Sequence, residues 1–283
     1  MKTKSFTEEL KAAREHSYAV GAFNIFNDLS ARAVISAAAE ENCPLILQTS
    51  VATVKKFGPA ELSGMLRRLA REAPVNVIIH LDHCRDIDLA KACIDAGWDS
   101  VMFDGSSLAI EENIRICREV VNYAHPRGVQ VEGEYGKIFG VEDDINVKDE
   151  SGVLADMEGS VRFVEESGID AYAPAIGTAH GVYKSSPRIN FELVNALAQG
   201  LETPIVIHGG TGLDEATFSR LILAGGAKIN VSTAIKHAYF DGFAEYVREN
   251  PDSVDPLKLD RTLEESILNV ARKHIITFRK NMK

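Results

Sequence analysis

Short runs of apolar, mostly β-branched residues recur along the chain, and each ends in a polar or glycine-rich patch. Such runs are typical of strands that are buried on both faces of a parallel sheet. They predict eight strands, at Ala19–Asn24, Leu45–Thr49, Val77–Asp82, Ser100–Asp104, Gln130–Tyr135, Ala171–Ala175, Pro204–His208 and Lys228–Val231.

The segments between these runs carry apolar residues at helical spacing, and several open on a residue suited to cap a helix, such as Asp28 or Asp214. The predicted helices are Leu29–Glu41, Ala60–Glu72, Ile87–Ala96, Glu111–Ala124, Gly159–Ser167, Phe191–Gln199 and Asp214–Ala224. A helical tail is expected from Ser232 to Lys283, with interruptions at Asn250-Pro251-Asp252 and Asp255-Pro256. Strands that alternate with helices predict an α/β fold.

Polar residues of catalytic type stand at the ends of most predicted strands, namely Asn24, Asp82 with His83, Asp104, Glu134, His208 and Asn230. A closed barrel gathers all its strand ends around one mouth, whereas an open doubly wound sheet feeds one crevice from two or three strands. The distribution therefore favours the barrel. We expect a (β/α)8 TIM barrel with a C-terminal helical extension, forming one domain over residues 1–283.

The formal net charge of -10 and the pI near 5.3 oppose nucleic acid or an anionic membrane as the main partner, because both attract basic surfaces. No apolar run has the length of a membrane helix, and the first residues do not form an apolar signal core. The four cysteines include no CxxC pair and are interpreted as free thiols. Together these features predict a cytoplasmic protein.

Three histidines are expected at the barrel mouth: His83 just past the third strand, His180 in the long connection 177–188, and His208 at the end of the seventh strand. Three imidazoles are the ligand set of a catalytic zinc site that keeps positions open for substrate. Nitrogen ligands favour Zn2+ over magnesium, although Co2+, Fe2+ or Mn2+ can occupy the same set. Asp82 places a carboxylate beside His83.

Two further segments predict a phosphate-binding cradle. Gly209, Gly210 and Thr211 form a glycine-rich turn ahead of a predicted helix, where backbone N–H groups and the helix dipole attract anions. Asn230 to Thr233, which includes Val231 and Ser232, follows the eighth strand. The loops after strands seven and eight are the usual phosphate site of this barrel, so a phosphorylated substrate is expected.

In this order along the chain, the motifs resemble those of the class II fructose-bisphosphate and tagatose-bisphosphate aldolases, and look closest to the tagatose-bisphosphate branch. The motifs are Val20-Gly21-Ala22-Phe23-Asn24, His80-Leu81-Asp82-His83, Val131-Glu132-Gly133-Glu134-Tyr135-Gly136, His180-Gly181-Val182-Tyr183-Lys184, His208-Gly209-Gly210-Thr211-Gly212 and Ile229-Asn230-Val231.

The resemblance implies a lyase that reversibly cleaves a ketose 1-phosphate or ketose 1,6-bisphosphate into dihydroxyacetone phosphate and an aldehyde such as glyceraldehyde 3-phosphate. It assigns the zinc to His83, His180 and His208, and a second or displaced metal position to Asp104 and Glu134. It makes Asp82 the residue that moves the proton of the C4 hydroxyl, and Glu142 the mobile-loop acid that serves the carbanion carbon.

The resemblance also implies the substrate contacts. Those to the dihydroxyacetone phosphate half come from Gly181, Lys184, Gly209, Gly210, Thr211, Asn230, Val231, Ser232 and Thr233, while Asn24 and Ser50 face the rest of the sugar. The resemblance further implies a monovalent cation near the phosphate loops. It also implies a homodimer or homotetramer.

One departure affects the substrate. The bisphosphate aldolases carry an Asp-Pro-Arg motif whose arginine binds the far-end phosphate, and this chain reads Asp255-Pro256-Leu257-Lys258. Leucine cannot bind phosphate, and lysine lacks the planar fork of arginine. An aldolase for a ketose 1-phosphate without the second phosphate is therefore the alternative.

Three other readings stay open at this point. A Schiff-base aldolase needs a desolvated strand lysine, for which Lys228 is the candidate. A non-catalytic barrel subunit would have little need for Asp82 and all three histidines. A metal-dependent hydrolase fits the two phosphate-type loops less well.

Overall fold

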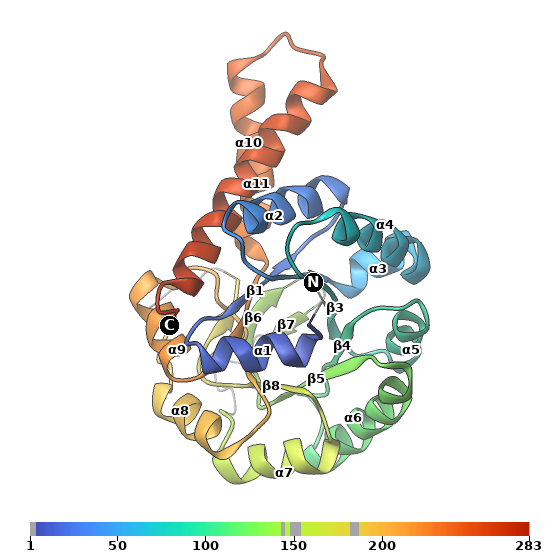
Figure 1. Cartoon of the computed structure of the whole chain (residues 1–283), viewed down its shortest axis with the longest axis vertical. Helices are drawn as coiled ribbons and strands as arrows, with labels where there is room; N and C mark the ends of the chain where they lie inside the picture. The colour runs from blue at the N-terminus through green and yellow to red at the C-terminus, as the bar shows by residue number, and fades with distance from the viewer. Residues whose placement is uncertain (1–3, 143–144, 148–153, 182–186, 283) are drawn as a thin grey trace.

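The computed structural model describes residues 4–282 except 143–144, 148–153 and 182–186. Eight parallel strands close into a barrel in the order β1-β11-β10-β8-β5-β4-β3-β2, so the predicted (β/α)8 barrel is confirmed (Figure 1). The barrel strands are β1 (Val20–Asn24), β2 (Leu45–Thr49), β3 (Val77–Cys84), β4 (Ser100–Phe103), β5 (Gln130–Tyr135), β8 (Ala171–Pro174), β10 (Ile205–Ile207) and β11 (Gly226–Val231).

Helices surround the barrel, as predicted. They are α2 (Asp28–Glu40), α4 (Pro59–Glu72), α5 (Ile87–Asp95), α6 (Ile110–Ala124), α7 (Met157–Ser167), α8 (Phe191–Gly200) and α9 (Glu215–Leu223), with a short 3-10 turn, η1 (His125–Arg127), after α6. Asp214 caps α9 as expected, whereas α2 is capped by Asn27 and not by Asp28. Asn27 is the N-cap because its side chain accepts from the backbone N–H of Ser30, whereas Asp28 is already the first residue of the helix.

Besides η1, five elements of the described residues were not expected. Helix α1 (Phe6–Glu15) precedes the barrel and α3 (Val51–Phe57) follows β2. Two long connections, residues 136–157 and 177–188, contain β6 (Phe139–Glu142), β7 (Ile145–Val147) and β9 (Ala179–His180). These three strands form a small separate sheet in the order β7-β6-β9.

The barrel interior has an apolar layer and a polar layer. At the N-terminal ends of the strands, α1 lies across the opening (Figure 1), and its Phe6 and Leu10 are fully buried. They pack against inward side chains such as Ile46, Ile78 and Val206. Because side chains alternate along a strand, the next inward residue of each strand lies closer to the C-terminal mouth. There the interior is polar, with Gln48, His80, Asp82, Glu132, Lys228 and Asn230 all buried.

Helices α10 (Thr233–Glu249) and α11 (Pro256–Arg279) form a hairpin, the arm, that projects from the barrel wall (Figure 1). Its base is fixed by the carboxylate of Glu41, which lies within 2.7 Å of Arg272 and 2.8 Å of Arg279. The expected C-terminal helical extension is thus present. Among the described helices none combines the length and hydropathy that crossing a membrane requires.

Candidate active site

A bulge in β3 brings two consecutive side chains to the barrel mouth. Leu81 pairs with Val101 of β4 and Cys84 with Phe103, so Asp82 and His83 together oppose one residue. His83 also has a left-handed backbone (φ 47°), which is uncommon for a side chain of this kind. The expectation that His83 lies past the strand end was wrong, because β3 continues to Cys84. The bulge re-aims His83 toward the mouth instead.

Asp82 is held by two asparagines from neighbouring strands. Asn24 Nδ2 donates to Asp82 Oδ2 at 2.8 Å, and Asn230 Nδ2 donates to Oδ1 at 3.3 Å. Gln48 in turn donates to Asn24 Oδ1 at 2.6 Å. Asp82 is 3% exposed, so these amides take the place of water around its carboxylate and fix its orientation.

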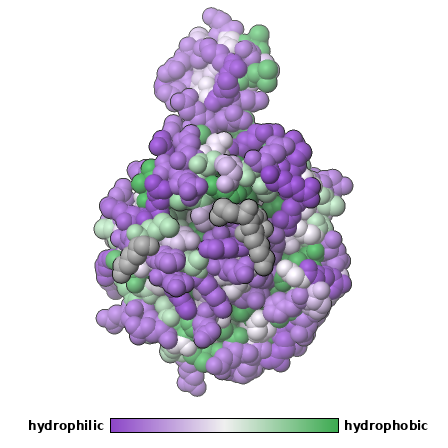
Figure 2. All heavy atoms as spheres, in the orientation of Figure 1, coloured by the Kyte–Doolittle hydropathy of each residue, from purple (hydrophilic) through white to green (hydrophobic). Residues whose placement is uncertain are grey.

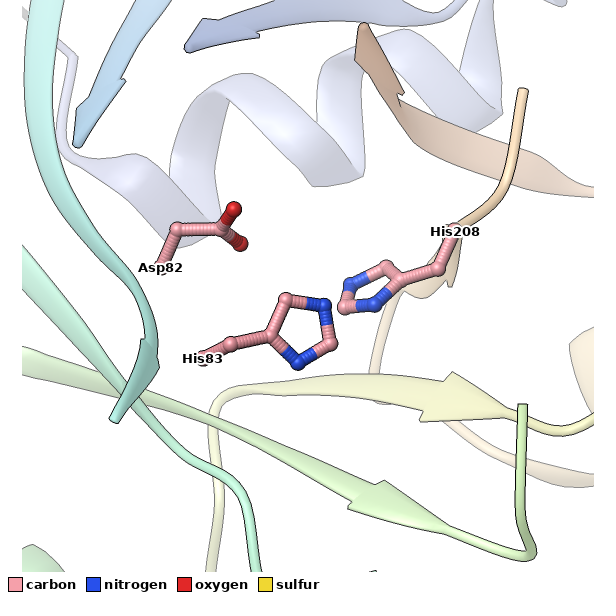
Figure 3. Close-up of side chains that lie close together, drawn as sticks. All are labelled: Asp82, His83 and His208. Atoms are coloured by element: carbon pink, nitrogen blue, oxygen red, sulfur yellow. The ribbon is translucent and has the colours of Figure 1, made fainter. Parts of the chain in front are cut away.

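The two described histidines of the predicted metal set lie together. The ring centroids of His83 and His208 are 4.6 Å apart in an edge-to-face arrangement, and Figure 3 shows the two rings next to each other beside the Asp82 carboxylate. One ligand atom from each of Asp82, His83 and His208 can be chosen so that all three lie within 4.8 Å of one another. This carboxylate and these two imidazoles match the donor types that bind a divalent transition metal.

Two more carboxylates border the histidines. Asp104, directly after β4, lies 3.3 Å from His83 Nδ1 and accepts from Arg85 Nη2 at 2.9 Å. Glu134 Oε2 lies 3.2 Å from His208 Nδ1 and 4.0 Å from His83 Nδ1. The predicted ligands of the second metal position therefore lie against the same two imidazoles.

The pKa values reflect this concentration of negative charge. Burial lowers the pKa of His83, but Asp82, Asp104 and Glu134 outweigh burial and raise the pKa to about 10. For Asp104, burial raises the pKa, but His83 and Arg85 hold it well below its usual range. A site that stabilises positive charge this strongly is suited to a cation, and a bound metal would compete with protons for the same nitrogens.

A buried ion pair beneath the histidines was missed at the sequence level. Glu132 and Lys228 are both fully buried, and Lys228 Nζ donates to Glu132 Oε2 at 2.9 Å. Glu132 Oε1 also lies 2.9 Å from His208 Nε2. The only available signal was alternation, since Glu132 lies two residues before Glu134 on the same strand face. The engagement of Lys228 disfavours a Schiff-base role, because that chemistry needs an available amine.

The predicted phosphate cradle is built closely around glycine. Gly209 has φ 70°, and a Cβ there would approach the backbone oxygen of Ala179 in β9 to 2.5 Å. A Cβ on Gly210 would lie 3.0 Å from the carbonyl of Asn230, at the end of β11. Ser232, buried, precedes the first turn of α10, which begins at Thr233. The two predicted segments thus meet, and only glycine allows the close approach of β9.

The remaining predicted residues are placed in part. The backbone of His180 pairs with Gly140 of β6, next to Ala179, and Gly181 follows with φ 83°. Glu142 ends β6, and for it as for His180 only the backbone is described. Ser50 caps α3 by accepting from the backbone N–H of Thr53. Lys184 lies outside the described residues.

A parallel barrel with imidazoles and carboxylates at its C-terminal mouth defines a class of metal-binding barrel enzymes, and comparison with known proteins gives the family. The family model for class II fructose-bisphosphate aldolase matches residues 4–283. The chain belongs to this family of metal-dependent aldolases, which are lyases.

Two curated relatives and one solved structure illustrate the similarity. The chain is 39% identical over 262 residues to the fructose-bisphosphate aldolase of Geobacillus stearothermophilus, covering 92% of this chain and 91% of the relative. It is 38% identical over 273 residues to the 6-phospho-5-dehydro-2-deoxy-D-gluconate aldolase of Halalkalibacterium halodurans, covering 95% and 93%. The crystal structure of the YdjI aldolase from Escherichia coli K12 superposes with a TM-score of 0.86 at 32% identity, covering 98% and 97%.

Proposed function

We propose that the protein is a divalent-metal-dependent aldolase that cleaves a ketose 1-phosphate, releasing dihydroxyacetone phosphate and an aldehyde. The observation that carries the proposal is the cluster of Asp82, His83 and His208 at the barrel mouth, with ligand atoms within 4.8 Å of one another. The glycine-rich cradle beside it supports a phosphorylated substrate.

The donor set fits a divalent metal, with zinc favoured by the imidazole nitrogens and Co2+, Fe2+ or Mn2+ as possible replacements. His83, His208 and His180 would hold it, and Asp104 and Glu134 would serve a second or displaced position. When bound, the metal supplies a Lewis acid that polarises the substrate carbonyl. We also propose a monovalent cation near the phosphate loops, which is supported only by the resemblance to the family.

The protein's own groups divide the proton transfers. Asp82, oriented by Asn24 and Asn230, accepts the proton of the C4 hydroxyl as the C3–C4 bond breaks. Glu142, at the end of β6, returns a proton to the carbanion carbon. Backbone N–H groups of Gly181, Gly209, Gly210 and the 230–233 segment bind the phosphate, together with the side chains of Lys184, Thr211, Ser232 and Thr233. Ser50 and Asn24 face the remainder of the sugar.

At the position of the far-end phosphate arginine, this chain carries Leu257. Relatives of similar identity are named for different substrates, fructose bisphosphate in one and 6-phospho-5-dehydro-2-deoxy-D-gluconate in another. Leu257, at the position of the far-end phosphate arginine, is 66% exposed, and the neighbouring Lys258 Nζ donates to Asn250 Oδ1 at 2.6 Å. Neither side chain offers a bidentate phosphate contact. We propose a ketose 1-phosphate or ketose 1,6-bisphosphate as the substrate, with a far-end phosphate, where the sugar carries one, held less firmly than by an arginine.

The direct test is cleavage of fructose 1,6-bisphosphate, tagatose 1,6-bisphosphate and fructose 1-phosphate, followed as dihydroxyacetone phosphate release. We expect release from at least one sugar, its loss on chelation and its return with added zinc. Release that is insensitive to the chelator would overturn the metal mechanism.

We also expect Leu257→Arg to favour the bisphosphates over fructose 1-phosphate, because arginine binds phosphate bidentately.

We place the active form as a homodimer or homotetramer joined through the arm. Phe240, Phe243 and Val247 are 69%, 45% and 48% exposed and share one face of α10 by their spacing. Figure 2 shows hydrophobic side chains gathered on one side of the arm. An exposed apolar stripe of this kind marks an association surface.

The buried free thiols, such as Cys93 and Cys117, agree with a reducing cytoplasm.

The arm assignment is tested by measuring molecular mass in solution. Phe240→Glu with Phe243→Glu should reduce the mass to that of a monomer, because buried charge opposes association. The control is Leu223→Glu, which introduces the same side chain at a 59% exposed leucine on α9 and should leave the mass unchanged. An unchanged mass in the double variant would rule the arm out as the interface.

A further inference from the structure

A fully buried lysine is unusual inside a barrel, and Lys228 has two polar partners there. Its Nζ donates to Glu132 Oε2 at 2.9 Å and to Asn230 Oδ1 at 2.9 Å. Glu132 Oε1 in turn lies 2.9 Å from His208 Nε2, and Asn230 Nδ2 donates to Asp82 Oδ1. Lys228 therefore lies between the proposed metal ligand and the proposed proton acceptor, without contacting the mouth itself.

The first branch fixes the imidazole of His208. An ionised carboxylate only accepts hydrogen bonds, so His208 Nε2 carries the hydrogen that Glu132 Oε1 accepts at 2.9 Å. The Nδ1 side of the ring then faces Glu134, at 3.2 Å, and the cluster with His83. A carboxylate behind a ligating histidine sets its tautomer and ring orientation.

The second branch fixes the amide of Asn230. Because the ammonium of Lys228 only donates, the atom of Asn230 that faces it must be Oδ1. The amide nitrogen Nδ2 is then directed to Asp82 Oδ1, at 3.3 Å. The Asp82 carboxylate also only accepts, so both partners require the same amide orientation, and Lys228 anchors Asn230 from the opposite side.

We propose that Lys228 and Glu132 are positioning residues that orient His208 for the metal and Asp82 for proton transfer through two branches of one buried network. The inference rests on the proposed function, since it takes His208 as a metal ligand. The alternative is a purely structural pair that joins β5 to β11, the strands that carry Glu132 and Lys228. The two roles differ in what happens when the pair is replaced without loss of stability.

Single substitutions would leave one buried charge unpaired and destabilise the fold, so both charges are removed together. In Glu132→Met with Lys228→Met, the pair becomes apolar and His208 loses its acceptor. In Glu132→Gln with Lys228→Met, an amide oxygen can still accept from His208, but Asn230 has lost its anchor. Tyr172→Phe is the control, because it removes a buried hydrogen bond, to Ser160 at 2.7 Å, elsewhere in the barrel wall.

Zinc affinity is measured by competition with a chromophoric chelator, coordination by the visible spectrum of the Co2+-loaded protein, and stability by thermal unfolding. The methionine pair should weaken zinc binding about 10- to 100-fold and alter the Co2+ spectrum, while the glutamine variant restores both. The glutamine variant should still lose kcat, by up to about 100-fold, with KM unchanged. The Tyr172→Phe control should keep its affinity, spectrum and kcat.

Wild-type zinc affinity in the methionine pair would overturn the His208 branch, and wild-type kcat in the glutamine variant would overturn the Asp82 branch. If the methionine pair does not fold, the glutamine variant still decides the second branch. A different result would contradict the proposed function itself: the His208→Ala variant would then bind zinc as tightly as the wild type.

Discussion

Replacing His208 with alanine should remove the bound metal and reduce aldol cleavage by about three orders of magnitude or more, because Lewis-acid stabilisation of the developing charge is worth several kcal/mol. His208 lies beside His83, with ring centroids 4.6 Å apart, so its loss removes one of the two described imidazoles of the candidate metal cluster. Metal content is measured on the purified protein, and cleavage is measured as release of dihydroxyacetone phosphate with saturating zinc.

His125→Ala provides the matched control. His125 is half exposed, bonds to Asp170 and lies on the short 3-10 turn that precedes β5, away from the mouth. Its replacement should leave metal content and kcat unchanged. If cleavage survives in His208→Ala at the control's level, the metal site does not include His208 and the proposed mechanism fails.

Asp82→Asn should have the second-largest effect, a fall in kcat of roughly 10²- to 10⁴-fold, the range of general acid–base catalysis. The substitution preserves the shape of the side chain but removes the charged oxygen that would take the C4 hydroxyl proton. Asn24 and Asn230 both donate to Asp82, so the new amide would also face two donors. KM should change less than kcat, because the substitution leaves the backbone groups of the phosphate cradle unchanged.

Metal content distinguishes the two possible roles of Asp82, because its carboxylate also lies within the candidate metal cluster. Retained metal with a low kcat supports proton transfer. Loss of metal comparable to that in His208→Ala would make Asp82 a ligand and would contradict its proposed catalytic role. Asn24→Ala should reproduce a smaller part of the kcat loss, because Asp82 keeps the second donor, Asn230.

The eight barrel strands were predictable because each is buried on both faces and reads as an apolar run with a polar end. Strands β6, β7 and β9 were not, since they are two to four residues long and lie in two long connections, the first of which is rich in glycine and acidic residues. Helix α1 was missed because its apolar residues, Phe6, Leu10 and Ala13, span only two turns. Its burial comes from closing the barrel, which is a tertiary effect.

The candidate site was predictable in its residue types and less so in its geometry. Strand-end positions located Asp82 and His208 correctly, but the bulge at His83 depends on the register between β3 and β4, which the sequence does not contain. Glu132 was overlooked because its partners, His208 and Lys228, are 76 and 96 residues away in the chain. Contacts of that range become visible only when the barrel closes.

Because α1 closes one end of the barrel, substrate can reach the interior only from the opposite end. Helix α1 covers one end of the barrel (Figure 1), and the candidate metal cluster of Asp82, His83 and His208 lies at the other end. A protein tethered to a bead or electrode through its N-terminus would therefore present its mouth to the solution. Tethering through the arm would instead hold the proposed association surface against the support, so the two immobilised forms would differ in assembly and not in access to substrate.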